Sequence, residues 1–478
     1  MADQPMLKFT SIDRDMPQKR DAIVRREDFH EIYAEYAEAK AQEQASRCSQ
    51  CGVPYCQTHC PLHNNIPDWL RLTAEGRLKE AYEISQATNT FPEICGRICP
   101  QDRLCEGNCV IEQSGHGTVT IGSVEKYITD TAWEKGWVQP IKPAVERAET
   151  VGIIGAGPGG LAAADVLRRA GVQVTIYDRY DRAGGLLTYG IPGFKLEKDV
   201  VMRRNEQLAL GGVTFRQNCN VGEDIGFQDI RGVHDAVIIA TGVYKSRDLS
   251  MPNGESDGIE KAIDFLTASN RKSFGDEVPE FDSGRMNADG KRVVVIGGGD
   301  TAMDCVRTSV RQGATSVKCL YRRDRANMPG SQREVQNAEE EGVVFEWLSA
   351  PKAFTTDGDK VAGVMVQKMR LGAPDTTGRQ APEVIEGADY VEEADLVIKA
   401  LGFEPEDLPA LWDQPELEVT RWGTIKAQFT TGRTELDGVY AVGDIVRGAS
   451  LVVWAIRDGR DCAEAILEQF GAAAMAAE

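Results

Sequence analysis

The sequence predicts an α/β protein in which a mainly helical domain precedes two Rossmann-like dinucleotide-binding domains. From about residue 148 to 245, apolar strand-like runs alternate with helical patterns, which is typical of a doubly wound parallel sheet. A strand followed by spaced glycines occurs at residues 151–160 and again at residues 292–302. Eight of the twelve cysteines lie ahead of both motifs, between residues 48 and 109.

The composition bounds the size and class of the protein. A chain of 478 residues is long enough for about two to four domains. Its net charge of −20 and pI near 4.9 argue against binding to nucleic acid or to anionic membrane surfaces. The N-terminus lacks the basic and apolar regions of a signal peptide, and no apolar run approaches the roughly 18 residues of a membrane span. We therefore expect a cytoplasmic protein.

The first 146 residues predict a small helical domain whose core is partly inorganic. A helical pattern is predicted from Asp28, and Glu31 three residues later completes a predicted capping box. The apolar face of this helix would carry Phe29, Ile32, Tyr33 and Tyr36. Residues 66–84 predict two helices with a break near Gly76. So short a chain between cysteine loops gains little stability from apolar burial alone, so we expect bound metal to support it.

The cysteines of this domain form closely spaced groups. Their pattern is Cys48-x2-Cys51-x4-Cys56-x3-Cys60-Pro61, then Cys95-x3-Cys99-Pro100, then Cys105-x3-Cys109. A dense group in a chain without an export signal favours metal or iron–sulfur ligation over disulfides. Prolines after cysteines and the nearby dinucleotide motif favour iron–sulfur clusters. Zinc is the alternative, and it would make the domain purely structural.

The first glycine motif, Gly155-Ala-Gly-Pro-Gly-Gly160, predicts a dinucleotide site. Gly155 permits the tight turn, Gly157 lets the backbone approach a pyrophosphate, and Gly160 lets the helix pack closely on the strand. The phosphates are then expected on the amides at the start of the following helix. Asp178, at the end of the next strand, is placed to accept hydrogen bonds from a ribose. An ordinary glycine turn is the alternative interpretation.

Later glycines complete the prediction for this first site. The run that ends at Gly242 is a buried strand with a glycine turn, and Gly185 follows Asp178 by seven residues. Gly443 and Asp444 stand between a strand and a helical run, where a carboxylate and helix amides can meet a ribityl–phosphate chain.

The second glycine motif is an internal repeat of the first. Gly297, Gly299 and Ala302 correspond to the three glycines of the first copy. At the next strand end the copies differ, because Arg322 and Arg323 stand where the first copy has an acid. An acid suits a free ribose hydroxyl and arginines suit a 2′-phosphate, so the second copy is predicted to bind NADPH. The predicted contacts are Gly297, Gly299, Asp300, Thr301, Ala302, Arg322 and Arg323.

Together these motifs resemble the small (β) subunits of NADPH-dependent bacterial glutamate synthases nearly from end to end. The most specific matches are the cysteine groups, the two glycine motifs and Ala441-Val-Gly-Asp444. The same module occurs in the N-terminal part of dihydropyrimidine dehydrogenase and in related ferredoxin:NADP⁺ oxidoreductase subunits. The resemblance implies a disulfide-reductase-type pair of Rossmann domains with the NADPH domain inserted into the FAD domain. The implied limits are 1–146 for the cluster domain, 147–255 and 400–478 for FAD, and 256–399 for NADPH.

The resemblance also implies an activity. Such subunits oxidise NADPH through FAD and pass electrons through two [4Fe–4S] clusters to a large (α) subunit, which makes L-glutamate from glutamine and 2-oxoglutarate. No catalytic acid or base is predicted, because hydride transfer needs cofactor positioning above all. The alternatives are an equivalent subunit of a ferredoxin:NADP⁺ oxidoreductase or pyrimidine-reducing complex, and a non-catalytic NADPH sensor stapled by zinc.

By analogy with the family, the cluster ligands fall into two sets. Cys48, Cys51, Cys56 and Cys109 are expected to hold one cluster. Most ligands of the other are expected to be Cys60, Cys99 and Cys105. The eighth ligand is expected to be Glu125, in Ile121-Gly-Ser-Val-Glu125, and Cys95 is its rival.

Overall fold

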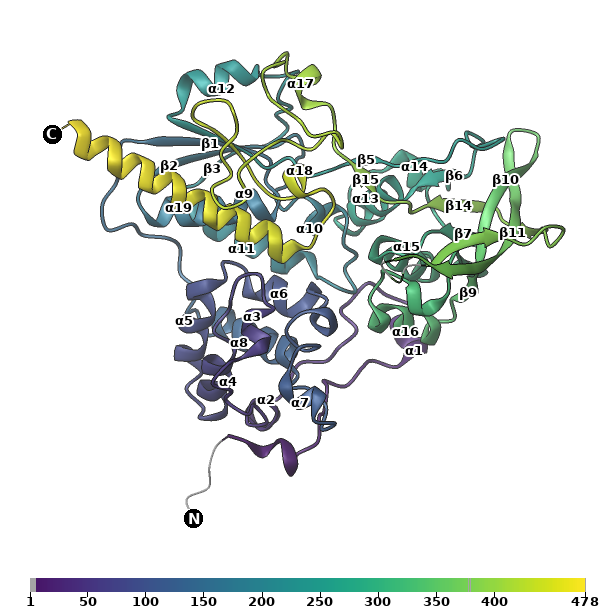
Figure 1. Ribbon diagram of the computed structural model, residues 1–478, viewed down its shortest axis with the longest axis horizontal. Coiled ribbons are helices and arrows are strands. Elements are labelled where there is room, and N and C mark those ends of the chain that lie inside the picture. The colour runs from purple at the N-terminus through teal and green to yellow at the C-terminus, as the bar shows by residue number, and fades with distance from the viewer. Residues whose placement is uncertain (1–5, 377, 379, 478) are drawn as a thin grey trace.

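The computed structural model describes residues 6–376, 378 and 380–477 and arranges them in three parts (Figure 1). A helical part comes first in the chain. It is followed by a first Rossmann domain, built on β1–β4 and β16, and by an inserted Rossmann domain, built on β6–β14. All three parts meet near the middle of the molecule.

The helical part encloses its own core (Figure 1). Trp69, Val124 and Ile128 are fully buried there, in the same cluster as Cys48 and Cys109. The prediction of two helices with a break near residue 76 is confirmed by α4 and α5. The elements are η1 (Lys8–Thr10), α2 (Glu38–Ala45), α3 (Tyr55–Thr58), α4 (Ile66–Ala74), α5 (Leu78–Thr88), α6 (Pro92–Ile98), η2 (Gln101–Arg103), α7 (Val110–Gln113) and α8 (Ile121–Glu134), with α1 (Ala22–Arg25) lying apart from them.

Residues 13–37 form an N-terminal arm that runs from the helical part to the inserted Rossmann domain (Figure 1). The prediction of a helix beginning at Asp28 is wrong. Residues 18–20 pair antiparallel with residues 32–34 instead, and the Asp28 carboxylate accepts hydrogen bonds from Arg20. Ile32 and Tyr36 are buried although the backbone here is extended, and Phe29 and Tyr33 are half-buried. The spacing of these side chains alone does not distinguish such a segment from a helix.

The first Rossmann domain has a five-stranded parallel sheet in the order β16-β4-β1-β2-β3. Helices α9 and α19 pack together over one face, and α12 covers the other. The strands are β1 (Thr150–Ile154), β2 (Gln173–Tyr177), β3 (Thr214–Arg216), β4 (Ala236–Ile239) and β16 (Val439–Ala441). The helices are α9 (Pro158–Arg169), α10 (Leu186–Tyr189), α11 (Lys198–Leu210), α12 (Phe227–Val233), α17 (Leu408–Leu411), α18 (Asp444–Arg447) and α19 (Val452–Ala477). Because both faces are covered, Val151–Ile154 of β1 and the whole of β4 are buried without the alternation of a half-exposed strand.

The inserted Rossmann domain repeats this arrangement with the strand order β6-β14-β7-β8-β9. A second, antiparallel sheet of β10–β13, which the sequence analysis did not predict, packs on it through Phe354 and Val364. The strands are β6 (Ile259–Lys261), β7 (Arg292–Ile296), β8 (Ser316–Tyr321), β9 (Val344–Trp347), β10 (Ser349–Asp357), β11 (Lys360–Pro374), β12 (Gln380–Val384), β13 (Tyr390–Glu393) and β14 (Leu396–Lys399). The helices are α13 (Ala262–Ser273), α14 (Pro279–Asp282), α15 (Asp300–Arg311), η3 (Arg325–Asn327) and α16 (Gln332–Glu340).

Two crossings of the chain connect the Rossmann domains. β5 (Lys245–Ser246) leads out and β15 (Phe403–Glu404) leads back, and the two pair as a short antiparallel ribbon. The inserted domain therefore lies between β4 and β16 of the first domain. The predicted fold class, a helical iron–sulfur domain before two Rossmann-like domains of which one is inserted into the other, is confirmed.

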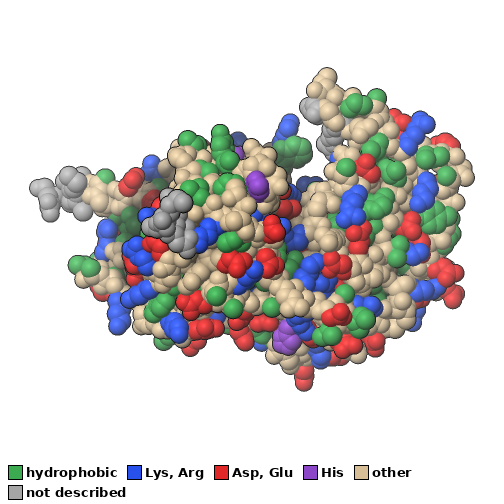
Figure 2. All heavy atoms as spheres, turned by 90° about the horizontal axis from the view of Figure 1, so that it is seen from below, with side chains coloured by type: hydrophobic (Ala, Val, Ile, Leu, Met, Phe, Trp, Pro, Cys, Tyr) green, Lys and Arg blue, Asp and Glu red, His purple; other side chains and the backbone are tan. Residues whose placement is uncertain are grey.

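The surface has mixed charge. On the face seen from below, acidic and basic side chains are interspersed, and no broad basic patch is visible (Figure 2). Over the part of the chain that the structure describes, no helix has the length and apolar character to cross a membrane.

Candidate functional site

A cavity of about 520 Å³ lies where the three parts meet. Its wall includes eight of the predicted cofactor residues and one predicted cluster ligand. They are Gly155, Gly157, Asp178, Gly242, Gly443 and Asp444 from the first Rossmann domain, Asp300 and Thr301 from the inserted domain, and Cys99 from the helical part. The wall does not include Gly160, Gly185, Gly297, Gly299, Ala302, Arg322 or Arg323. One cavity thus joins the two dinucleotide motifs and a cysteine loop.

The first glycine loop leaves room for a ligand at the start of α9. Gly155 has a φ of +107°, and a Cβ there would lie 2.4 Å from the Ala240 carbonyl oxygen. A Cβ at Gly160 would lie 2.2 Å from the carbonyl oxygen of Gly155, so helix and strand pack too closely for any side chain. At Gly157, by contrast, a Cβ would meet no atom within 4 Å. The open space lies at the amides of the helix N-terminus, which is where a pyrophosphate fits.

A second observation also fits a polar ligand in this cavity. The Thr241 hydroxyl lies in the cavity wall, is buried, and has no hydrogen-bond partner among the described residues. Buried polar groups are rarely left unpaired, so an unpaired hydroxyl in a cavity wall fits a polar ligand at that place. The residues present therefore fit a flavin dinucleotide.

Asp178 holds the glycine loop as well as lining the cavity. One carboxylate oxygen accepts a hydrogen bond from the Ala156 amide at 2.6 Å, and the other accepts from the Tyr180 amide at 2.8 Å. Burial raises the pKa of this carboxyl group above its usual value, against the effect of these two bonds. Across the cavity wall, burial raises the pKa of Asp444 to about 7.

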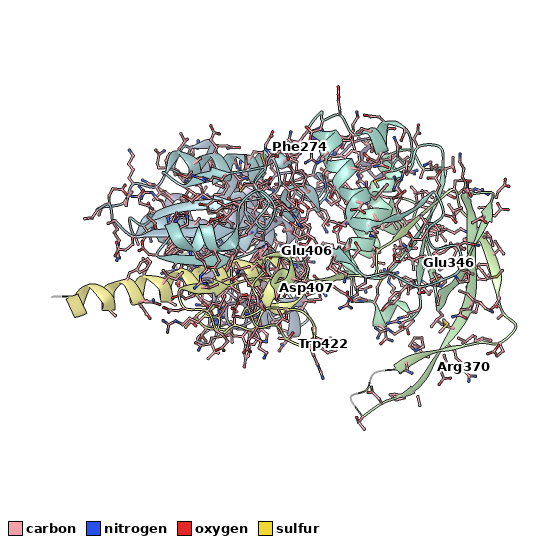
Figure 3. All side chains as sticks on the ribbon, turned by 90° about the horizontal axis from the view of Figure 1, so that it is seen from above. Phe274, Glu346, Arg370, Glu406, Asp407 and Trp422 are labelled. Atoms are coloured by element: carbon pink, nitrogen blue, oxygen red, sulfur yellow. The ribbon has the colours of Figure 1, made fainter. Side chains whose placement is uncertain are left out.

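Sequence reasoning missed a cluster of aromatic and charged residues in the same wall. The Arg179 guanidinium lies 4.9 Å from the Tyr244 ring centre and 5.4 Å from that of Tyr180, and it donates to Glu406 at 2.9 Å. Figure 3 shows Glu406 between the two Rossmann domains. Arg179 and Tyr180 directly follow Asp178 in the sequence, but Glu406 comes from the returning crossing and only the fold brings it there.

The second glycine loop has the same local geometry at the start of α15. A Cβ at Gly297 would lie 2.2 Å from the Ala400 carbonyl oxygen, and a Cβ at Gly299 would meet no atom within 4 Å. Asp300 does not point freely into the cavity, because one carboxylate oxygen accepts from the Ser331 amide at 2.9 Å and the other pairs with Arg103 of the helical part at 3.2 Å.

Arg322 and Arg323 follow the end of β8, the place that Asp178 occupies after β2. Within the described residues neither guanidinium forms an ion pair or a side-chain hydrogen bond, and the Nε of Arg323 is buried without a partner. The neighbouring Arg325 differs, because it donates to Glu339 at 2.8 Å. Two uncommitted cations thus stand where the repeat predicts a phosphate.

Four cysteines of the first predicted cluster set share one small cavity. Cys48, Cys51, Cys56 and Cys109 all line it, although Cys109 is far from the others in sequence. Burial raises the pKa of the Cys56 thiol to about 12, and Cys48 and Cys109 add to the shift as its neighbours. A group bound by all four thiolates would lie in this cavity.

The three cysteines of the second predicted set have Glu125 as a common neighbour. Burial raises the pKa of the Cys60 thiol to about 12, with Cys95 and Glu125 as neighbours that raise it further. The Cys95 thiol and burial raise the thiol pKa of Cys99, burial raises that of Cys105, and Glu125 adds to both shifts. Both candidates for the eighth ligand therefore lie beside this set.

Glu125 and Cys95 are held by one shared residue. The Glu125 carboxylate accepts hydrogen bonds from Asn64 at 3.0 Å and from Asn89 at 3.3 Å. The Cys95 thiol donates to the side-chain oxygen of Asn89 at 3.8 Å. Burial raises the pKa of Glu125 to about 8, so its charge is costly unless a cation lies nearby.

In the described ranges, no three His, Cys, Asp or Glu side chains are placed to hold one metal ion. The cysteine spacing and the neighbouring dinucleotide motif are the observations that favour iron–sulfur clusters over zinc.

Comparison with known proteins agrees with this geometry. Residues 25–137 match the family model described as dihydropyrimidine dehydrogenase domain II, 4Fe-4S cluster. Residues 149–459 match the model described as pyridine nucleotide-disulphide oxidoreductase. A glutamate synthase [NADPH] small chain from Azospirillum brasilense is 65% identical over 466 residues, which cover 98% of this chain and 96% of that one. The chain belongs to the glutamate synthase small-chain family.

Other relatives in this family cover most of the chain too. The putative small chain of Cereibacter sphaeroides is 76% identical over 393 residues, which cover 82% of this chain and 94% of that one. The small chain of Escherichia coli K12 is 46% identical over 468 residues, which cover 97% and 98%. Among solved structures, Mycobacterium tuberculosis FprA in complex with NADPH has a TM-score of 0.58 at 22% identity, covers 70% of this chain and 87% of its own, and supports the fold alone.

Family membership confirms the resemblance inferred from the motifs. The chain is an NADPH-dependent flavin and iron–sulfur oxidoreductase of the small-chain family, and it acts as an electron-input subunit. FAD, NADPH and 4Fe–4S chemistry are the cofactor set of this family.

Proposed function

We propose that the chain accepts hydride equivalents from NADPH and delivers electrons through two [4Fe–4S] clusters to a cytoplasmic large subunit that makes L-glutamate from glutamine and 2-oxoglutarate. The observation that supports this most is the shared cavity, whose wall combines the first glycine loop, the start of α15 and the loop of Cys99. One wall thus carries residues of the proposed FAD site, of the proposed NADPH site and of the second cluster set.

The domain limits that we propose follow the three parts. Residues 1–146 hold the clusters, residues 147–255 with 400–478 hold FAD, and residues 256–399 hold NADPH. The chain leaves the first Rossmann domain and returns to it near the ribbon of β5 and β15, which supports these limits.

For FAD, we propose that the amides at the start of α9 bind the pyrophosphate above Gly157, while Asp178 and Asp444 bind hydroxyl groups. The open space at Gly157 and the unpaired Thr241 hydroxyl support this assignment. FAD, when bound, converts a two-electron hydride into the single electrons that iron–sulfur clusters accept. The chain's own residues position the dinucleotides and exclude water, and none of them needs to transfer a proton as a catalytic acid or base.

For NADPH, we propose binding at the start of α15. The helix amides above Gly299 bind the pyrophosphate, and the uncommitted guanidinium groups of Arg322 and Arg323 bind the 2′-phosphate. Asp300 is better described as a residue that ties the loop to Ser331 and Arg103 than as a free ligand group.

For the clusters, we propose two ligand sets. The first is Cys48, Cys51, Cys56 and Cys109, supported by their common cavity. The second is Cys60, Cys99, Cys105 and Glu125. Since Cys99 also lines the dinucleotide cavity, the second set is the one nearest to the flavin.

The test is to assay the purified chain with and without the large subunit. Alone, it should oxidise NADPH with an artificial electron acceptor and form no glutamate from glutamine and 2-oxoglutarate. Addition of the large subunit should couple NADPH oxidation to glutamate formation. Glutamate formation by the purified chain alone would contradict the proposal, as would a failure of NADPH to bleach the flavin absorbance under anaerobic conditions.

A further inference from the structure

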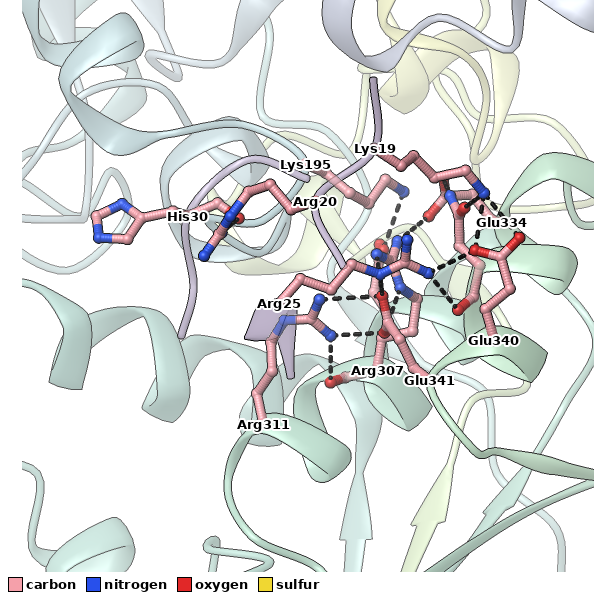
Figure 4. Close-up of polar contacts among 12 residues, drawn as sticks. Lys19, Arg20, Arg25, His30, Lys195, Arg307, Arg311, Glu334, Glu340 and Glu341 are labelled. Carbon is pink, nitrogen blue, oxygen red and sulfur yellow. Dashed lines mark hydrogen bonds and ion pairs between the residues drawn. The ribbon is translucent and has the colours of Figure 1, made fainter. Parts of the chain in front are cut away.

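The turn of the N-terminal arm, at residues 19–25, contacts a buried ion cluster of the inserted Rossmann domain (Figure 4). Arg25 is 1% exposed and donates to Glu341 at 2.9 Å and to Glu340 at 2.8 Å. Lys19, from the same arm, donates to Glu340 and to Asn337 at 2.8 and 3.0 Å. Through these contacts the arm reaches the C-terminal half of α16 and the residue that follows it.

The first Rossmann domain enters the same junction. Phe194, which is 1% exposed, lies under the guanidinium groups of Arg307 and Arg311, with 4.4 and 4.0 Å between each Cζ and the ring centre. The adjacent Lys195 pairs with Asp304 of α15 at 2.9 Å. The arm also touches this domain, because Phe29 packs against Phe194. Three separate segments of the chain therefore meet at the buried face of α15.

The returning limb of the arm is fixed to the helical part. The Glu31 carboxylate accepts hydrogen bonds from Arg97 of α6, at 2.6 Å, and from Lys126 of α8. Arg97 is itself held by Asp130 at 2.7 Å. The arm thus connects α6, which ends beside Cys99, with α15 and α16 of the inserted domain.

The ion cluster is satisfied without the arm. Although burial raises the pKa of Glu341, hydrogen bonds from Arg311 and Arg307 hold it at about 2. These two arginines donate to the carboxylate at 2.7 and 2.8 Å. Removal of the Arg25 guanidinium leaves Glu341 with two cationic partners, so the inserted domain retains its own fold. Arg25 therefore joins domains and does not complete one.

Other polar contacts also join the inserted domain to the helical part, where Arg333 donates to Gln101 at 2.9 Å and Arg103 pairs with Asp300 at 3.2 Å, but both of these arginines are partly exposed. Its covalent links are the two crossings at the β5–β15 ribbon. Its ion pairs with the first Rossmann domain near α13, Arg182–Asp276 and Arg271–Asp181, are partly exposed and screened by solvent. Domains that are joined by a ribbon and a polar interface rotate relative to one another by default. The buried junction is what opposes such a rotation.

We propose that the N-terminal arm holds the inserted Rossmann domain in the orientation in which NADPH can reduce FAD, and that Arg25 is the positioning residue of this restraint. The inference rests on the proposed function, since it assigns NADPH to the inserted domain and FAD to the first. Arg25 does not line the dinucleotide cavity. It acts through α15 and α16: Asp300 and Thr301 in the first turn of α15, and Ser331 directly before α16, all line the cavity.

The experiment compares the holoenzyme with an Arg25→Met variant and a matched Arg20→Met control. Arg20 lies in the same arm but pairs with Asp28 of the arm itself. FAD, iron and sulfide contents should be equal in all three proteins, and the Kd for NADP⁺ should be unchanged. In Arg25→Met, the rate of flavin reduction at saturating NADPH should fall by roughly ten- to a hundredfold, because small misplacements of reacting groups have effects of that size. Reduction of the same flavin by dithionite should be unaffected.

The other outcomes would contradict the restraint, the role of Arg25 or the proposed function. A wild-type rate of flavin reduction in Arg25→Met overturns the restraint. Equal slowing in Arg20→Met shows a general effect of the arm and also overturns the role of Arg25. If Arg25→Met fails to fold, Lys19→Met is decisive: it removes the half-exposed second anchor, and an unchanged rate refutes the proposal. If wild-type flavin is not reduced by NADPH at all, the proposed function fails and not the restraint.

Discussion

The choice between NADPH and NADH is predicted to depend on Arg322 and Arg323. Neither guanidinium has an acidic partner among the described residues, so replacing it by alanine breaks no ion pair within the protein. What is lost is contact with the 2′-phosphate, and a hydrogen bond to a charged group contributes about 1.5–3 kcal/mol. Since about 1.4 kcal/mol is a factor of ten, each substitution should lower the NADPH/NADH ratio of kcat/KM roughly ten- to a hundredfold. Use of NADH should hardly change, because it lacks the phosphate.

The assay is steady-state oxidation of each nucleotide with an artificial acceptor, for Arg322→Ala and Arg323→Ala separately. The chain offers a matched control in Arg325→Ala, whose guanidinium is already bound to Glu339 at 2.8 Å. This variant should keep the wild-type ratio. If neither of the first two substitutions lowers the ratio, the phosphate is bound elsewhere and the comparison of the two repeats is wrong.

Three further predictions follow from the cavity and the cysteine groups. Gly157→Ala should weaken FAD binding without changing the melting temperature of the FAD-free chain. Gly160→Ala should destabilise the FAD-free chain by about 1–3 kcal/mol, because the new Cβ overlaps a backbone oxygen of the same loop. Equal effects of the two substitutions in calorimetry would contradict these different roles. Iron and sulfide per chain should fall in Glu125→Ala and stay at the wild-type level in Cys95→Ser, and the reverse result would make Cys95 the ligand. The raised pKa of Asp444, about 7 against 3.8, means that the folded FAD-free chain binds this proton more tightly than the unfolded chain does, so stability falls as pH rises from about 4 to 7. Asp444→Asn should therefore raise the melting temperature at pH 8 and leave it nearly unchanged at pH 4.

The sequence predicted those features that depend on short segments. Glycine positions in a strand–turn–helix unit are set by local sterics, and the loops of Gly155 and Gly297 have the geometry that the motif implies. The repeat also predicted two sheets with the same topology. The strand orders β4-β1-β2-β3 and β14-β7-β8-β9 are equivalent, with the strand before each glycine loop in the same position. Cysteine spacing placed the thiols in one domain, and the fold brought Cys109 to the cavity of the first three.

The features that were missed depend on contacts between distant segments. The sequence predicts a helix from Asp28 in the arm. The prediction fails because an extended segment buried at a domain junction can space its apolar residues as an amphipathic helix does. Glu406 joins Arg179 through a crossing far along the chain, and no local pattern reports such a pair. The antiparallel sheet of β10–β13 was also overlooked, since its strands lie outside the glycine motifs that guided the prediction.

The arm has a consequence for the order in which the molecule is completed. Arg25 and Glu341 are 316 residues apart in the chain. At about 5–20 residues per second of synthesis, the arm emerges roughly 15–60 s before its partner does. During this interval the cysteine segments are already made, while the arm's buried contacts with the inserted domain do not yet exist. Iron and sulfide therefore have a period in which to reach the nascent thiols, and the segment that is synthesised first is among the last to reach its final place.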